Sequence, residues 1–323
     1  MHLLSIDQLS DAQIGLILDE GARWFTFNRQ PRRSAKRLEG LTVINAFFED
    51  STRTLLSFEI AANRLGAQVV TMQVERSSIK KGETLEDTGR TLNAMRPDAL
   101  VIRHGTSGAP AALAAIMDCP VINAGDGIGE HPTQALLDAA TIRQHFGRIA
   151  GLKVAICGDL KHSRVARSNV KLLRRLGAEV RLAAPPSLSL DGLSDTQPID
   201  EAVEGAEIVM MLRIQRERMT ESLVAAPVEE MSKLNEPERW TRIDSNPSST
   251  TEYLARYGLT TDRFQRAAFN AVIMHPGPIN RGVEIEGALA DDPRRSLITL
   301  QVEMGVAVRM ACLDLLTAER VGS

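Results

Sequence analysis

Two hydrophobic periodicities alternate along this chain. Short apolar runs are typical of buried strands, and longer segments with apolar residues at every third or fourth position are typical of helices. The predicted strands are Val43–Phe47, Gln68–Met72, Ala99–Ile102, Val121–Asn123, Lys153–Gly158, Glu179–Ala183, Glu207–Leu212 and Ala271–Met274. The predicted helices lie within Met1–Trp24, Leu55–Leu65, Leu85–Met95, Ala109–Met117, His131–Phe146, Val165–Leu176 and Ser296–Leu316. The first and last helices are predicted to be amphipathic, and the alternation of strands with helices indicates parallel sheets.

Local signals mark several helix ends. Ser10, with Gln13 three residues later, is predicted to cap the first helix. Pro132 suits a first helical position, and Gly66 and Gly147 are predicted helix stops.

The length of the chain predicts two domains. A chain of 323 residues exceeds what one hydrophobic core usually supports. The predicted fold class is α/β, with two doubly wound parallel-sheet domains joined by interdomain helices. We expect residues 1–147 and 296–323 to form the first domain, with the C-terminal helix packing back on it, and residues 148–295 to form the second.

Composition narrows the class of protein. Hydrophobic residues make up 43% of the chain and the formal net charge is −3, so neither a basic nucleic-acid-binding face nor a polybasic membrane patch is indicated. The sequence shows no basic-then-apolar leader and no apolar run of membrane-spanning length, and we expect a cytoplasmic protein. Cys119, Cys157 and Cys312 are widely separated and odd in number, which indicates buried thiols and not a disulfide framework or a zinc site.

The segment from Ser51 to Thr54 carries the strongest chemical signal. It places three hydroxyls and a guanidinium where the apolar run ending at Phe48 gives way to a helix. Ser51 is a favourable N-cap, and the free N–H groups of the first turn, the helix dipole, the hydroxyls and the Arg53 fork would converge on one point. Such a point suits a phosphate, because charge-assisted hydrogen bonds contribute roughly 1.5–3 kcal/mol each. Taken alone, the segment is equally compatible with an ordinary helix cap and a solvated arginine.

Further polar residues follow other predicted strands or open the next helix. They are Arg103, His131, Gln134, Arg164, Arg213 and Gln215. Because open α/β sheets bind ligands at the carboxyl ends of their strands, these residues predict a cleft rich in arginine and poor in carboxylates. That composition favours a small ligand with several negative charges.

Other chemistries are less favoured. The strand that ends at Gly158 outlines a dinucleotide-binding unit, but the further glycines and the ribose-binding acid of that fingerprint are missing. No carboxylate pair or serine or cysteine nucleophile typical of hydrolases is apparent. The histidines lack the spacing of metal ligands, so no metal is predicted.

Five stretches together resemble one enzyme family. The segment Phe48–Glu59 resembles the carbamoyl-phosphate motif of the aspartate/ornithine carbamoyltransferase family. Resemblance to the catalytic chain of its aspartate-specific members extends to Ser77–Thr84, Gly125–Gly127 with His131–Gln134, Arg213–Arg218 and His275–Pro278. The ornithine branch would show His-Cys-Leu-Pro in place of the His-Pro-Gly-Pro that begins at His275. The resemblance runs from the first helix to the last.

The resemblance implies a role for each matching residue. The phosphate of carbamoyl phosphate would be held by Ser51, Thr52, Arg53 and Thr54. Its carbonyl oxygen would receive hydrogen bonds from Thr54, Arg103 and His131, the implied catalytic groups, and its amide would meet Gln134. The carboxylates of L-aspartate would be bound by Arg164, Arg213 and Gln215. Further substrate contacts would come from Pro276, Gly277 and Pro278, with backbone carbonyls of the first two facing the substrate amines. When the domains close, Glu49 would bridge to Arg164 and Arg218.

The resemblance also implies partners. Ser77 and Lys81 would enter the site from a neighbouring subunit, Lys81 on the aspartate side, so the enzyme would be a homotrimer with shared sites. The product would be N-carbamoyl-L-aspartate, formed in the second step of pyrimidine biosynthesis. No cofactor would be required, because the departing phosphate can accept the amine proton. The resemblance leaves open whether the trimers join a regulatory or dihydroorotase-like chain.

Two alternatives remain. A paralogous transcarbamoylase could use another amine, and a catalytically silent homologue could serve a structural role, although every matching position is filled. One segment, Met219–Thr251, is longer than the family pattern. It could form a lid, a subunit contact or a disordered surface excursion, and we favour the last.

Overall fold

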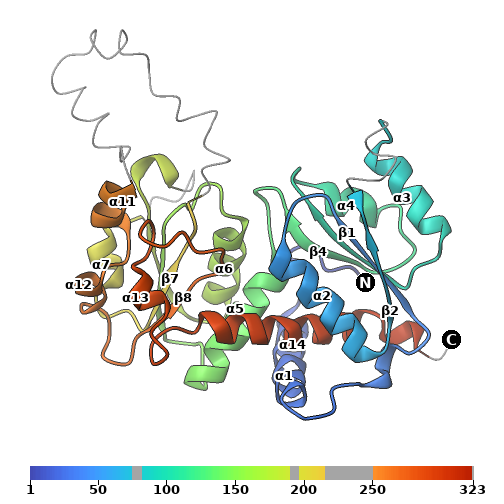
Figure 1. The fold of residues 1–323 in the computed structure, drawn as a ribbon, viewed down its shortest axis with the longest axis horizontal. Coiled ribbons are helices and arrows are strands. Elements are labelled where there is room, and N and C mark those ends of the chain that lie inside the picture. The colour runs from blue at the N-terminus through green and yellow to red at the C-terminus, as the bar shows by residue number, and fades with distance from the viewer. Residues whose placement is uncertain (75–81, 190–195, 215–249, 322–323) are drawn as a thin grey trace, which may run out of the picture. The chain divides into compact units, whose positions relative to one another are not determined.

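The computed structural model describes residues 1–74, 82–189, 196–214 and 250–321. All eight predicted strands are present in these ranges, in two four-stranded parallel sheets with flanking helices (Figure 1). The predicted α/β class with two doubly wound parallel sheets is therefore confirmed.

The chain forms two compact units, and each contains one sheet. Unit 1 comprises Met1–Ile149, Arg167–Arg175 and Thr299–Ser323, and unit 2 comprises Ala150–Ala166 and Leu176–Ile298. The C-terminal helix thus belongs to unit 1, as expected. The predicted domain limits, 1–147 with 296–323 and 148–295, stay a prediction.

The sheet of unit 1 has the strand order β2-β1-β3-β4. Its strands are β1 (Thr42–Phe47), β2 (Gln68–Met72), β3 (Ala99–His104) and β4 (Val121–Asp126). The edge strand β2 is partly exposed, whereas the middles of the other three are buried. Burial on both faces explains why the middles of β1, β3 and β4 are mostly apolar in sequence.

Helices cover both faces of this sheet. They are α1 (Asp11–Asn28), η1 (Lys36–Leu38), α2 (Thr52–Leu65), α3 (Leu85–Ala94), α4 (Ala109–Ala114), α5 (Pro132–Phe146), most of α14 (Ile298–Leu316) and η5 (Ala318–Arg320). One face packs Ile44 and Ile102 of the strands against Leu92 of α3 and Leu113 of α4. In Figure 1, α2 and α14 lie on the side away from α3 and α4.

The sheet of unit 2 repeats the same order, β6-β5-β7-β8. Its strands are β5 (Lys153–Cys157), β6 (Glu179–Ala183), β7 (Ile208–Met211) and β8 (Val272–Met274). Its helices are η4 (Pro186–Leu188), α7 (Ile199–Val203), α11 (Thr250–Tyr257), α12 (Thr261–Phe264) and α13 (Gly287–Ala290). Helix α6 (Arg164–Arg175) begins in unit 2 and continues in unit 1 from Arg167.

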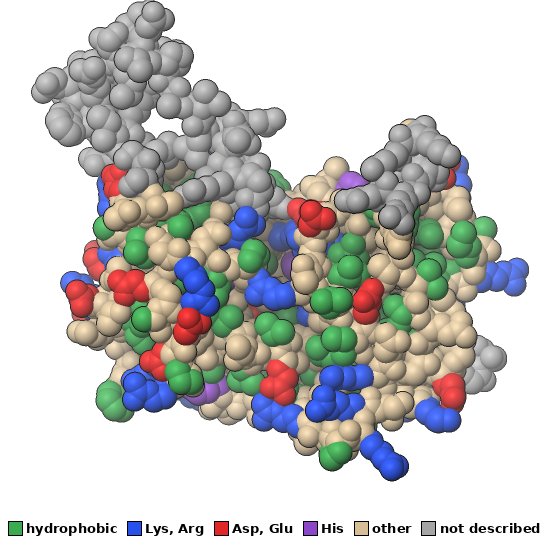
Figure 2. All heavy atoms as spheres, in the orientation of Figure 1, with side chains coloured by type: hydrophobic (Ala, Val, Ile, Leu, Met, Phe, Trp, Pro, Cys, Tyr) green, Lys and Arg blue, Asp and Glu red, His purple; other side chains and the backbone are tan. Residues whose placement is uncertain are grey.

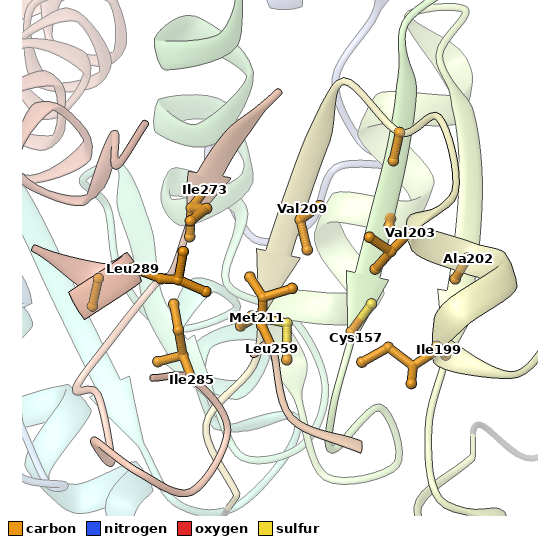
Figure 3. Packing of buried hydrophobic residues seen from close by; sticks show 14 of the residues in the cluster. Cys157, Ile199, Ala202, Val203, Val209, Met211, Leu259, Ile273, Ile285 and Leu289 are labelled. Atoms are coloured by element: carbon orange, nitrogen blue, oxygen red, sulfur yellow. The ribbon is translucent and has the colours of Figure 1, made fainter. Parts of the chain in front are cut away.

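One face of this second sheet forms a separate hydrophobic core. Figure 3 shows Cys157 of β5, Met211 of β7 and Ile273 of β8 pointing toward the same layer of side chains. Val203 of α7 and Leu289 of α13 close this layer. Unit 2 therefore has a hydrophobic core of its own.

The predicted helix ends are confirmed where they were most specific. Ser10 and Gln13 form a reciprocal capping box at the start of α1. Pro132 is the first residue of α5, and Gly66 and Gly147 are left-handed caps of α2 and α5. The three cysteines are buried and free, as predicted.

The prediction for the last helix is partly wrong. Every side chain from Ala307 to Asp314 in α14 is buried, so the second half of the helix has no exposed polar face. Arg309 and Asp314 belong to that buried half, which is why the sequence looks amphipathic there. The short helices of unit 2 were not predicted, because segments of four to eight residues carry little periodicity.

On the face drawn in Figure 2, basic and acidic side chains are interspersed. Within the described ranges no helix has both the length and the apolar character that crossing a membrane requires.

Candidate active site

The two sheets each have one topological switch point, and several of the predicted site residues that the structure describes lie beside it. In unit 1 the chain leaves β1 toward β2 and then returns to β3 on the other side of β1, so the switch point lies between β1 and β3. In unit 2 it lies between β5 and β7 by the same argument. Crevices at the carboxyl ends of such neighbouring strands are where open α/β sheets bind ligands.

Ser51 to Thr54 follow β1 and open α2 at the first switch point. Ser51 is the N-cap residue by its extended backbone, and its hydroxyl makes no capping hydrogen bond. The first-turn N–H groups and this hydroxyl can therefore serve an anion. Thr54 is buried, Thr52 is exposed and Arg53 lies between these extremes. Burial lowers the pKa of Arg53, and the nearby Asp138 carboxylate opposes that shift.

Arg103 lies across the switch point, at the end of β3. Phe47 of β1 is paired with Arg103, and Phe48 N–H donates to the Arg103 carbonyl oxygen at 2.8 Å. The guanidinium forms an ion pair with Glu49 at 3.0 Å and donates to the Ala124 carbonyl oxygen at 3.4 Å. These contacts hold a cation beside the segment from Ser51 to Thr54.

The loop after β4 carries His131 into the same edge of the sheet. Gly127 has φ +48°, and a Cβ there would lie 2.4 Å from Ser107 Oγ and 2.6 Å from Ser107 N, so only glycine fits. Asp126 accepts hydrogen bonds from the backbone N–H groups of Gly108 and Gly129, at 2.7 Å each, through its side chain and its carbonyl oxygen. The loop is therefore tightly folded around Asp126.

A buried glutamate anchors the start of α5. His131 is the N-cap residue, and its backbone N–H donates to Ser168 Oγ at 2.9 Å. Ser168 donates in turn to Glu130 Oε2 at 3.1 Å, and Lys171 contacts Glu130 Oε1 at 2.7 Å. Ile6 N–H also donates to Glu130. His131 is thus held in place by contacts to α6 and to the N-terminal segment.

Gln134 and Asp138 connect the site to the interior of unit 1. Gln134 Nε2 donates to Asp138 Oδ1 at 3.0 Å. Asp138 also accepts hydrogen bonds from Gln301 at 2.8 Å and from Asn169 at 2.8 Å. Its burial raises the pKa to about 6, although these hydrogen bonds and the Arg309 charge oppose the shift.

Arg164 and Arg213 flank the second switch point. Arg164 is the first residue of α6 and is buried, and Arg213 follows β7. Gly158 at the end of β5 has φ +127°, and a Cβ there would lie 2.7 Å from the Leu212 carbonyl oxygen. This close approach of two backbones keeps the segments that carry the two arginines near each other within unit 2.

The loop after β8 is held by a buried histidine. His275 Nδ1 accepts a hydrogen bond from Gly277 N–H at 2.8 Å, and Nε2 lies 3.2 Å from Glu284 Oε1. Nε2 therefore carries the proton and donates to the carboxylate. The pair fixes the turn of Pro276, Gly277 and Pro278, whose Gly277–Pro278 peptide bond is cis. Asn280 Nδ2 contacts the Ile214 carbonyl oxygen, which joins this turn to the Arg213 segment.

The structure thus groups the predicted residues by unit. Unit 1 brings together Ser51, Thr52, Arg53, Thr54, Arg103, His131, Gln134 and Glu49, and unit 2 brings together Arg164, Arg213, Pro276, Gly277 and Pro278. Four predicted residues, Ser77, Lys81, Gln215 and Arg218, lie outside the described ranges. So does most of the long segment Met219–Thr251, of which only Thr250 and Thr251 are described, at the start of α11.

Sequence reasoning missed the supporting residues. Glu130, Asp138, Ser168 and Gln301 are buried polar side chains that hold the predicted ones or one another. A carboxylate set between Leu137 and Ala139 in an apolar helical run was a usable signal, because buried carboxylates need partners. In the described ranges no group of three or more His, Cys, Asp or Glu side chains is arranged to hold a metal ion.

Comparison with known proteins defines the class first. Residues 1–144 match the description "Aspartate/ornithine carbamoyltransferase, carbamoyl-P binding domain", and residues 150–316 match "Asp/Orn binding domain" of the same family. The chain therefore belongs to the aspartate/ornithine carbamoyltransferase family. The resemblance stated from sequence motifs, and with it the prediction of a carbamoyltransferase, is confirmed.

Individual relatives within this family are similar to the chain over almost its whole length. The chain is 56% identical to an aspartate carbamoyltransferase catalytic subunit from Rhizorhabdus wittichii, over 99% of this chain and 96% of that protein. It is 53% identical to the corresponding subunit from Sphingopyxis alaskensis, over 99% of this chain and 88% of that protein.

Two solved structures are similar over nearly the whole fold. Aspartate transcarbamoylase from Trypanosoma cruzi in complex with carbamoyl phosphate has a TM-score of 0.80 at 31% identity, covering 97% of this chain and 94% of that one. The catalytic subunit of M. jannaschii aspartate transcarbamoylase has a TM-score of 0.78 at 32% identity, covering 100% and 99%.

Proposed function

We propose that this protein transfers the carbamoyl group of carbamoyl phosphate to the amine of L-aspartate, giving N-carbamoyl-L-aspartate and phosphate. The observation that carries the proposal is the anion site of unit 1, where a helix N-terminus with Ser51 and Arg53 faces Arg103 across a switch point. The arginines Arg164 and Arg213 at the switch point of unit 2 supply a second set of cations, suited to the carboxylates of aspartate.

The chemistry needs little beyond positioning and charge stabilisation. The aspartate amine attacks the carbamoyl carbon, the C–N bond forms and the C–O bond to phosphate breaks. The carbonyl oxygen gains negative charge on the way, and Thr54, Arg103 and His131 are the proposed donors to it. Removing one such donor typically raises the activation free energy by about 2.7–4 kcal/mol. The amine proton leaves with the phosphate, which is itself a base.

Positioning of the two substrates supplies much of the remaining rate acceleration. Two anionic substrates repel each other, and the arginines of the two sets offset that repulsion. Holding the reactants in attack geometry contributes up to about 7–11 kcal/mol in favourable cases. Gln134 is proposed to meet the carbamoyl amide, and the backbone carbonyls of Pro276 and Gly277 to meet the substrate amines. We place the reaction in pyrimidine synthesis, which consumes carbamoylaspartate.

Assembly is part of the proposal. By resemblance, Ser77 and Lys81 of one chain complete the site of a neighbour, so the active form is a homotrimer. The names of the relatives speak of catalytic subunits, which supports assembly into an oligomer. Whether a regulatory or dihydroorotase-like chain joins it is a separate question. The bridge from Glu49 to Arg164 and Arg218 on domain closure stays a prediction, and within unit 1 Glu49 pairs with Arg103.

The testing experiment measures product from carbamoyl phosphate with L-aspartate and with L-ornithine, side by side. We expect carbamoylaspartate only. Product from another amine instead would show that the unit 2 arginines were assigned the wrong substrate, and no product from either amine would favour a silent homologue.

Two variants then separate the substrates. Arg53→Ala should raise the KM for carbamoyl phosphate about 10- to 100-fold, since one charge-assisted hydrogen bond is lost. Arg213→Ala should raise mainly the KM for aspartate. Arg64→Ala, at the opposite end of the same helix as Arg53, is the matched control and should leave both constants unchanged. Normal kinetics in Arg53→Ala or Arg213→Ala would overturn the corresponding assignment.

A further inference from the structure

Asp138 is a fully buried carboxylate in the middle of helix α5. Three side-chain amides converge on it, and they come from three different parts of unit 1. Gln134 and Gln301 donate to Oδ1 at 3.0 and 2.8 Å, and Asn169 donates to Oδ2 at 2.8 Å. A carboxylate with this many donors is built into the fold and is not a solvated side chain.

Two arginines favour the ionised form of this carboxylate. Arg309 of α14 is buried with its guanidinium 5.1 Å from the centre of the Phe58 ring, and its charge lowers the pKa of Asp138. Burial lowers the pKa of Arg53, in the first turn of α2, and the Asp138 carboxylate acts to raise it, so the two opposite charges stabilise each other. Burial still raises the pKa of Asp138 to about 6, which leaves the group ionised at neutral pH.

The ionised carboxylate dictates how the Gln134 amide is turned. A carboxylate accepts hydrogen bonds and cannot donate one. Gln134 must therefore present its N–H₂ group to Asp138, and its Oε1 is turned the other way. Within the described ranges the Gln134 side chain makes one hydrogen bond, to Asp138, and its Oε1 accepts none. The third residue of α5 thus presents an acceptor, one turn after His131.

An acceptor at this position distinguishes ligands of the same shape. The carbamoyl group carries N–H₂, which can donate to Oε1, whereas an acetyl group carries a methyl group in its place. An inverted Gln134 would turn its own N–H₂ toward the carbamoyl N–H₂, and two donors would face each other. A site built to hydrogen-bond a substrate N–H rejects the analogue that lacks it, because its polar group stays unpaired.

We propose that Asp138 is a positioning residue that fixes the Gln134 amide with its oxygen toward the substrate, and that it thereby selects carbamoyl phosphate over acyl phosphates such as acetyl phosphate. The inference rests on the proposed function, since it takes the carbamoyl amide as the group that Gln134 meets. It adds to the proposed function a residue that touches no substrate, and it explains how the protein would choose between two mixed anhydrides of phosphoric acid.

The test compares the dissociation constants of carbamoyl phosphate and acetyl phosphate, measured by calorimetry on the whole protein. The Asp138→Asn variant keeps the shape but offers one acceptor and one N–H₂ group, so both orientations of Gln134 become available. We expect the preference for carbamoyl phosphate to fall about 3- to 10-fold, because only part of the population keeps the competent orientation. Loss of the charge near Arg53 affects both ligands alike and cancels in the ratio.

A control variant and a rescue variant show whether a changed preference comes from the orientation of the Gln134 amide or from a general disturbance of the structure. Gln301→Met removes another donor to the same oxygen but leaves the carboxylate facing Gln134, so the ratio should stay within about twofold of wild type. In the double variant Gln134→Glu with Asp138→Asn, both oxygens of residue 134 are acceptors and the new amide can donate to one of them. The preference for carbamoyl phosphate should return there.

The outcomes are separable from those of the proposed function. An unchanged ratio in Asp138→Asn, an equal fall in Gln301→Met, or no rescue in the double variant would overturn the inference even if wild type makes carbamoylaspartate. A wild type that makes no carbamoylaspartate overturns the proposed function, while its binding ratios still decide the inference. If Asp138→Asn does not fold, the wild-type ratio at pH 5 and pH 7.5 replaces it. Protonated Asp138 is a donor, so the ratio should fall at pH 5.

Discussion

At the scale of single residues, the candidate site depends on buried polar side chains behind the ones proposed to meet the substrates. Asp138, Arg309 and Glu130 are all buried in unit 1. A buried charge is tolerated only when hydrogen bonds and opposite charges compensate it, and removing one partner is costly. These residues therefore couple the geometry of Gln134 and His131 to the folding of the unit.

The raised pKa of Asp138 predicts a pH dependence of stability. Its pKa is about 6 in the folded protein against an ordinary 3.8, so the folded state binds the proton more readily than the unfolded state. The stabilising contribution is fully present below about pH 4 and is lost as the pH rises through 6. We expect the unfolding free energy of wild type, relative to Asp138→Asn, to fall on the order of 3 kcal/mol over that range.

Urea unfolding of both proteins at a series of pH values measures this difference. Groups other than Asp138 titrate in both proteins, so their contributions cancel in the difference between the two unfolding free energies. Parallel stability curves between pH 4 and 7 would show that Asp138 keeps an ordinary pKa in the folded state.

At the scale of elements, strand order decides which residues meet. Ser51 to Thr54 and Arg103 are distant in sequence, and they are neighbours because β1 and β3 pair in parallel with Phe47 opposite Arg103. The same rule joins Gly158 to Leu212 through the pairing of β5 with β7. Residues at the carboxyl ends of adjacent parallel strands always share one edge of the sheet.

Gly158→Ala tests this geometry in unit 2. The new Cβ would lie 2.7 Å from the Leu212 carbonyl oxygen, and φ of +127° disfavours any side chain. Because the obstacle is backbone, the segment that carries Arg213 must shift. We expect the KM for aspartate to rise about tenfold, since a displacement of about 1 Å can cost that much or more. Steady-state kinetics measures it, and the KM for carbamoyl phosphate should not change.

The matched control is Gly205→Ala in the same unit. Gly205 also has a positive φ, +63°, but no atom lies within 4 Å of a Cβ placed there. This variant should lose about 1–2 kcal/mol of stability from backbone strain and keep both KM values. If the two variants behave alike, backbone strain alone explains Gly158→Ala, and the close approach to Leu212 has no role in aspartate binding.

At the scale of the whole molecule, two units with the same strand order each carry one set of cations. The proposed shared sites predict complementation between chains. At a carbamoyl phosphate concentration near the wild-type KM, Arg53→Ala and Lys81→Ala chains, each with little activity alone, should regain activity when mixed. In a mixed trimer some sites combine an intact segment around Arg53 with an intact Lys81 from the neighbour.

Activity of refolded or subunit-exchanged mixtures, against each variant treated alone, measures this recovery. Arg53→Ala mixed with Arg213→Ala is the second comparison, and its recovery should be absent, because both residues are expected to act in the site of their own chain. Failure of the first mixture to gain activity would count against shared sites.

Sequence by itself determined much of this protein. The hydrophobic pattern was enough to predict all eight strands, because most of them are short apolar runs buried on both faces, and the partly exposed β2 and β6 keep enough apolar residues to be recognised. Local chemistry was enough for the ends of α1, α2 and α5, since caps and stops depend on adjacent residues. The hydroxyls and guanidinium of Ser51 to Thr54 indicated an anion site for the same reason.

Only the tertiary structure decided the rest. That Asp138 meets Gln134, Asn169 and Gln301, and that Arg309 is buried in what looks like an amphipathic helix, depends on packing between segments far apart in the chain. The pattern of polar residues along one helix cannot show whether a charge faces water or another helix. The burial and the partners that set the pKa of Asp138 and the orientation of Gln134 exist only when α5, α6 and α14 are packed together.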